Sequence, residues 1–239
     1  MSPVAIAQAM VVATLLAATP AVAQTTDRPD VQDLVLGAGF DAQPGPFREY
    51  ACGTNGGPPS IPVSGFGEFA KCPAEAETGL HEITFRYDDE IEYFALAMNL
   101  QPIAERYGGT RFGSFPVIVS ALFDDAGILR GYRAVTDDRG SLRERRIAYT
   151  MGVFAKSQFK GSEWNCQSEP PARGETPLGN QFVKDDCTTT TAGGESVKLR
   201  IRLLHRPGQA AIDPFTGEKR NGQYESMARL EVFDPEAQK

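Results

Sequence analysis

Hydrophobic and polar residues alternate in three stretches of the chain, residues 81–87, 197–203 and 227–233. Because a strand turns successive side chains to opposite faces, each stretch predicts a strand with one buried face. Residues 116–123 and 128–135 are more continuously apolar, and the turn sequence Asp124-Asp125-Ala126-Gly127 separates them. These two stretches predict a β-hairpin that contributes to the core.

Apolar residues at helical spacing predict two helices in the first half of the chain. The first follows Asp88-Asp89 and has apolar residues at positions 91, 94, 95 and 98, with continuation of the preceding strand through Ile91 and Tyr93 as the alternative. The second begins at a capping box of Ser141 and Glu144 and has apolar residues at positions 147, 151, 154 and 155.

Residues 1–23 have the pattern of a secretory signal peptide, since they are apolar and uncharged and end in Pro20 and Ala21-Val22-Ala23. We expect cleavage after Ala23. Retention as a membrane anchor is the alternative, because the apolar run approaches the ~20 residues that span a bilayer. Residues 24–46 have few apolar side chains and predict a flexible lead-in.

The four cysteines are Cys52, Cys72, Cys166 and Cys187. In an exported protein an even number of cysteines predicts disulfides, and three pairings of four are possible. We favour Cys52–Cys72 and Cys166–Cys187, because the members of each pair are close in sequence and similarly flanked. Each bond would stabilise the fold by roughly 3 kcal/mol through the unfolded state. Because metal-site spacings of Cys and His and phosphate-binding glycine loops are missing, we expect neither a metal nor another cofactor.

The surroundings of the two cysteine pairs are similar, which predicts an internal duplication. Glu49-Tyr50-Ala51-Cys52 corresponds to Glu163-Trp164-Asn165-Cys166, and a Pro-rich loop, a second cysteine and a strand follow in both cases. The offset is 114 residues for the first cysteines and 115 for the second. Since the identities are few, coincidence is the alternative. The duplication divides the chain into units 47–159 and 160–239, which we expect to share one core.

The net charge of −7 argues against nucleic acid or an anionic membrane as a partner. The arginines between positions 139 and 146 are interpreted as a solvated helix face, with a local basic patch as the alternative. After removal of the signal peptide, no stretch is apolar enough to cross a membrane.

Candidate catalytic residues are few. Asp88, Asp89, Glu90 and Glu92 form the densest acidic cluster, and such carboxylates can act as acid and base or bind calcium. An acidic helix N-terminus is the simpler interpretation. The two histidines, His81 and His205, lack a recognisable nucleophile motif around them, so we assign no catalytic residue.

The candidate binding residues are Tyr50, Asn55, Gly56, Gly57 and Trp164. Tyr50 and Trp164 precede a cysteine by two residues, and an aromatic side chain there could line a groove beside the Asn55-Gly56-Gly57 loop. Packing of these rings over the disulfides is the alternative. A glycine-rich loop held by a disulfide is a rigid platform for recognition.

Together these patterns predict an α+β fold with a mostly antiparallel sheet, two helices and two local disulfides. The predicted function is that of a periplasmic or secreted binding protein without catalytic activity, whose partner is a protein or glycan of the cell envelope. Two alternatives are a cell-envelope hydrolase that uses carboxylates near residues 88–92 and a structural subunit of an envelope assembly. A large exposed apolar patch would favour the subunit.

Overall fold

The computed structural model describes residues 29–87, 90–100, 102–103, 110–139, 142–159, 163–206, 210–212, 219–221 and 224–237. The predicted signal peptide, Asp88-Asp89 and Ser141 of the predicted capping box lie outside these residues.

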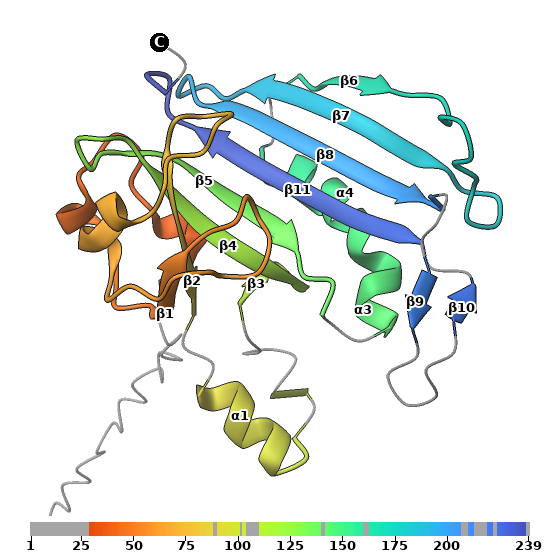
Figure 1. The fold of residues 1–239 in the computed structure, drawn as a ribbon, viewed down its shortest axis with the longest axis horizontal. Helices are drawn as coiled ribbons and strands as arrows, with labels where there is room; N and C mark the ends of the chain where they lie inside the picture. The colour runs from red at the N-terminus through yellow and green to blue at the C-terminus, as the bar shows by residue number, and fades with distance from the viewer. Residues whose placement is uncertain are drawn as a thin grey trace, which may run out of the picture.

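A nine-stranded antiparallel sheet forms the body of the protein (Figure 1). Its strands lie in the order β1-β2-β4-β5-β11-β8-β7-β6, and β3 pairs with β4. The strands are β1 (Arg48–Cys52), β2 (His81–Arg86), β3 (Arg111–Phe112), β4 (Phe115–Phe123), β5 (Leu129–Thr136), β6 (Asn165–Ser168), β7 (Val183–Thr190), β8 (Ser196–Leu204) and β11 (Glu225–Phe233). The predicted hairpin is β4 and β5, and the three alternating stretches are β2, β8 and β11.

Three α-helices are described: α1 (Glu90–Ala97), α3 (Leu142–Ile147) and α4 (Met151–Gln158). The second predicted helix is divided, because the 3-10 turn η4 (Ala148–Thr150) separates α3 from α4. Short elements complete the fold: η1 (Val31–Asp33), η2 (Phe40–Ala42), η3 (Phe66–Lys71) and the two-stranded β9 (Ala210–Ile212) and β10 (Lys219–Asn221). The α+β fold with a mostly antiparallel sheet is confirmed.

One face of the sheet, the core face, carries the alternating apolar residues of every central strand. Register places Phe85 of β2, Val119 of β4, Leu230 of β11 and Leu199 of β8 on this face. Over β8 and β11 it is covered by α4, whose Gly152 lies so close that an added Cβ would meet Ile201 at 2.3 Å.

Aromatic side chains cover the other end of the core face. Phe66 of η3 packs edge-on against Phe85 at 5.4 Å between ring centroids, and Phe47 packs against the same ring at 4.3 Å. Val31 and Leu34, from the segment predicted to be a lead-in, are buried in the core as well.

The opposite face, the charged face, carries a buried ionic cluster. The side chain of Arg133 in β5 is only 1% exposed and lies 2.8 Å from Glu75, 2.9 Å from Glu82 and 2.8 Å from Glu231. Arg229 of β11 pairs with Glu231 at 2.8 Å. Arginine can remain buried here because three carboxylates surround its guanidinium group.

Both predicted disulfides are present, Cys52–Cys72 and Cys166–Cys187, and the described residues include no free cysteine. The first joins β1 to the residue that follows η3, and the second joins directly opposed residues of β6 and β7. Because such bonds persist in oxidising compartments, they fit an exported protein.

The internal duplication is not confirmed. Leaving β3 aside, four strands of the sheet precede the predicted boundary at residue 160 and four follow it, and each set runs from an edge of the sheet to its centre. The sequence alignment, however, equates β2 with β8, and β2 is second from its edge whereas β8 is third. Cys187 lies within β7, whereas Cys72 lies between η3 and β2.

Candidate functional site

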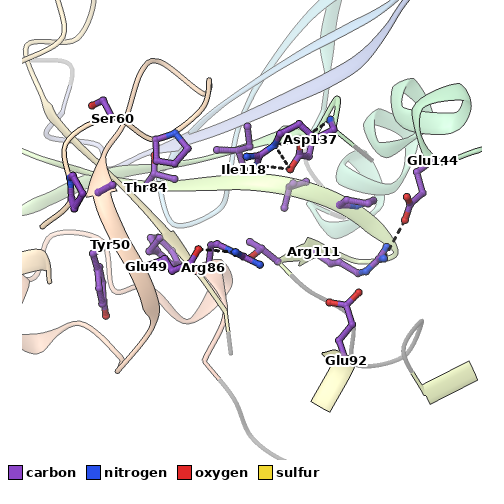
Figure 2. A pocket seen from close by; sticks show the side chains of 18 residues that line it. Glu49, Tyr50, Ser60, Thr84, Arg86, Glu92, Arg111, Ile118, Asp137 and Glu144 are labelled. Carbon is purple, nitrogen blue, oxygen red and sulfur yellow. Dashed lines mark hydrogen bonds and ion pairs between the residues drawn. The ribbon is translucent and has the colours of Figure 1, made fainter. Parts of the chain in front are cut away.

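A pocket of about 690 Å³ lies beside the edge strand β1 (Figure 2). Segments far apart in the sequence meet in its lining. The lining residues are Glu49, Tyr50, Ala51, Pro59, Ser60, Pro62, Thr84, Phe85, Arg86, Glu92, Thr110, Arg111, Pro116, Val117, Ile118, Asp137, Arg139 and Glu144.

The chemistry of the pocket is dominated by ion pairs. Arg86, the last residue of β2, lies 2.6 Å from Glu49, and Arg111, the first residue of β3, lies 3.2 Å from Glu144 of α3. Figure 2 shows both pairs within the pocket. Guanidinium and carboxylate groups therefore alternate along its lining, so hydrogen-bond donors and acceptors are both available to a ligand.

A third pair lies in the turn after β5. Arg139 and Asp137 are 2.7 Å apart, and the Asp137 carboxylate also accepts a hydrogen bond from the backbone N–H of Arg139 at 2.9 Å. Burial raises the pKa of Asp137, but these bonds to Arg139 outweigh it and the net pKa lies below the ordinary value. Asp137 therefore stays ionised at neutral pH.

Glu49 adopts an unusual backbone conformation. Its φ is +51°, in the left-handed region that side chains other than glycine and asparagine rarely occupy. The register of β1 and β2 shifts between Arg48 and Ala51, so Glu49 lies in a local bulge. Such strain costs about 1–3 kcal/mol and concentrates at functional sites. Here it accompanies the contact of the Glu49 carboxylate with Arg86.

The remaining lining is largely apolar. Pro59, Pro62 and Pro116 contribute rings, and Ile118 contributes a side chain on the charged face. Thr84 adds a hydroxyl that is 3.1 Å from the hydroxyl of Ser120. The pocket can therefore contact both apolar and polar groups of a ligand.

Part of the predicted acidic cluster lies at this site. Glu92 of α1 lines the pocket, and Figure 2 shows its carboxylate directed towards Arg111. Glu90 lies outside the lining and is 3.7 Å from Arg48. Asp88 and Asp89 are outside the described residues.

Tyr50 lines the pocket but directs its ring away from the ion pairs in Figure 2. The ring packs edge-on against Phe66 at 5.1 Å, and its hydroxyl accepts a hydrogen bond from the backbone N–H of Phe47 at 2.8 Å. Burial raises the pKa of Tyr50, and the bond to Phe47 only partly offsets this. Its ring serves packing in the core.

The Asn55-Gly56-Gly57 segment is fixed on the charged face. The backbone N–H groups of Asn55 and Gly56 donate to the Glu82 carboxylate at 2.6 and 3.2 Å. Arg229 donates to the backbone and side-chain oxygens of Asn55. These hydrogen bonds hold the start of the loop in place, but it is the later residues Pro59, Ser60 and Pro62 that reach the pocket.

Trp164 lies elsewhere. It precedes β6, at the opposite edge of the sheet from β1, so the structure does not bring it together with Tyr50. Its ring packs against Phe159 at 6.2 Å, and the ammonium group of Lys156 lies 5.9 Å from the ring centroid. Its participation in binding remains a prediction.

The arginines of the pocket were not among the predicted site residues. Arg86, Arg111 and Arg139 belong to different elements and share no motif. The single sequence clue is the position of Arg86 at the polar end of an alternating strand. Only the sheet order brings the three together.

Within the described ranges, no cluster of His, Cys, Asp and Glu could hold a metal ion, and no helix could span a membrane. Comparisons of the chain with protein-family models, curated proteins and solved structures found no match. The geometry of the site is therefore the basis for a functional proposal.

Proposed function

We propose that this chain is an exported binding protein that holds a small polar ligand of the cell envelope in the pocket beside β1. The observation that carries the proposal is the set of three arginine–carboxylate pairs lining one pocket of about 690 Å³. That volume lies within the range of small-molecule sites, roughly 300–1,000 Å³. The two disulfides support export to an oxidising compartment such as the periplasm.

A glycan fragment fits the chemistry of the lining. Carboxylates such as Asp137 accept hydrogen bonds from hydroxyl groups, and guanidinium groups such as Arg139 donate to ring and hydroxyl oxygens. The proline rings and Ile118 can contact the apolar face of a sugar ring. Because the three arginines are already paired with carboxylates, a neutral ligand can bind without leaving any of these paired charges unpaired.

A second candidate is a glycan hydrolase, favoured by the four carboxylates in the lining, those of Glu49, Glu92, Asp137 and Glu144. Two suitably placed carboxyl groups can act as acid and base, or as acid and nucleophile. Mass spectrometry of envelope oligosaccharides after prolonged incubation separates the candidates. Recovery of intact oligosaccharide supports the binding protein, whereas shortened products support the hydrolase.

Calorimetric titration with fragments of cell-envelope glycans tests the binding proposal. We expect one class of fragment to bind, and Arg86→Met and Arg139→Met each to weaken its binding by roughly tenfold or more, as loss of a charged hydrogen bond does. Arg200→Met is the matched control, because Arg200 of β8 forms a similar ion pair with Asp186 of β7. Equal loss in the control, or affinity that depends on Trp164 and not on the pocket arginines, contradicts the proposal.

A further inference from the structure

Helix α1 and the turn that follows it expose an unusual amount of apolar surface. Tyr93 is 72% exposed, Phe94 59% and Met98 69%, and Leu96 and Leu100 are exposed too. Of the residues expected to form its buried stripe, Ala95 is buried, but Phe94 and Met98 face solvent. Figure 1 shows the helix projecting from the end of the sheet. A helix with apolar side chains on several sides is normally covered by another surface.

The charges on α1 restrict what can cover it. Its first turn carries Glu90 and Glu92, and the helix has no lysine or arginine. This combination disfavours an anionic lipid surface, which attracts basic residues. It favours a protein surface that offers apolar contacts together with positive charge, since aromatic residues and methionine are enriched at protein interfaces.

Such a surface exists on this chain, along the outer side of α3, η4 and α4. Arg143, Arg146, Ile147 and Val153 recur at spacings of three, one and six residues and are exposed, Val153 by 71%. Arg143, Arg146 and Ile147 stand at i, i+3 and i+4 and so share one face of α3, whereas Val153 is exposed on α4, beyond the η4 turn. Within the described residues neither Arg143 nor Arg146 forms an ion pair. We call these four exposed residues the α3–α4 outer face.

We propose that α1 of one copy docks on the α3–α4 outer face of a second copy. Apolar side chains of α1 would cover Ile147 and Val153, while its acidic first turn would approach Arg143 and Arg146. Two such contacts related by a two-fold axis close the assembly as a dimer, the commonest oligomer. The dimer does not rest on the ligand proposed for the pocket, because Phe94 and Val153 lie outside the pocket lining, although Glu92 of α1 belongs to both.

Sedimentation velocity of the exported full chain over a concentration series tests the dimer. Phe94→Asp breaks the α1 side, and Val153→Asp breaks the outer-face side. Both side chains are exposed, so each variant should fold, which thermal unfolding verifies. We expect each variant alone to raise the dissociation constant of the dimer roughly tenfold or more.

Mixing the two variants is the decisive arm. The Val153→Asp copy retains an intact α1, and the Phe94→Asp copy retains an intact outer face, so one contact can re-form and a heterodimer should appear. If the mixture contains no more dimer than either variant alone, the proposed pairing is wrong.

Reversing the charge of two outer-face arginines distinguishes docking on this face from nonspecific association. Arg143→Glu combined with Arg146→Glu should weaken the dimer, whereas Arg173→Glu, at an exposed loop position, should leave it unchanged. A wild-type chain that stays monomeric throughout overturns the proposal. The proposal is also overturned if the wild-type chain is a monomer that floats with phosphatidylcholine vesicles and Phe94→Asp abolishes this flotation, because α1 would then bind lipid.

Discussion

Arg133→Met probes the buried ionic cluster under the Asn55-Gly56-Gly57 loop. Methionine nearly preserves the volume of the side chain but removes the charge that Glu75, Glu82 and Glu231 share. Glu82 is itself 2% exposed and would remain as a buried carboxylate without its ion-pair partner. Breaking a buried ion pair from one side costs about 3–5 kcal/mol, because the remaining charge stays desolvated.

That cost is a large fraction of the free energy of unfolding of a typical domain, which is about 5–15 kcal/mol. It corresponds to a fall in melting temperature of roughly 6–20 °C for a chain of this length. Guanidinium chloride unfolding followed by circular dichroism measures it. Arg200→Met is the control, because its ion pair with Asp186 is about half exposed and should contribute no more than about 1 kcal/mol.

The difference in stability between wild type and Arg133→Met should also depend on pH. Burial raises the pKa of Glu75, but hydrogen bonding to Arg133 and its charge outweigh burial, and the net pKa is below its ordinary value of 4.5. The stability from this pair is therefore present above pH 4.5 and is lost as the pH falls through the folded-state pKa. The stabilities of wild type and Arg133→Met should converge in acid. If Arg133→Met lowers the free energy of unfolding by less than about 1 kcal/mol at neutral pH, Arg133 does not stabilise the buried carboxylates as described.

Three further outcomes follow from named contacts. Replacing both Cys166 and Cys187 by alanine should cost about 3 kcal/mol, since the bond closes a loop of 21 residues; an unchanged denaturation midpoint would contradict this. Burial lowers the pKa of His81, but its contacts with the Cys72 carbonyl and Asp125 outweigh burial, and the net pKa lies above the ordinary value of 6.5. The stability from these contacts should therefore fall as the pH rises from 6.5 through the raised pKa. Asp125→Asn should flatten this pH slope in thermal unfolding. Glu49→Gly should relieve the left-handed strain yet weaken ligand binding, which calorimetry and melting temperature together measure; tighter binding would count against the site.

The strands were predictable because their side chains alternate where one face is buried. Ile83 and Phe85 lie on the core face, as the pattern at residues 81–87 indicates. Both disulfides were predictable because their members are close in sequence. The sheet order was not, since nothing local shows that β11 inserts between β5 and β8.

The buried ionic cluster and the pocket were less accessible to sequence reasoning. Arg133 occupies a polar position in an apolar strand, and only the approach of Glu75 and Glu82 makes it a buried residue. Arg86 and Arg139 come together because β2 and β5 both flank β4. Tyr50 was found by its position before Cys52, yet its backbone neighbour Glu49 provides the charge in the pocket.

The binding pocket is tested most directly by nitrogen-15 NMR of the arginine side chains during titration with cell-envelope glycan fragments. We expect the Nε–H signals of Arg86, Arg111 and Arg139 to shift together with a single dissociation constant, while the signal of Arg200 does not move. Shifts at the Trp164 indole with the pocket arginines unmoved would contradict it, as would a spectrum that no fragment changes.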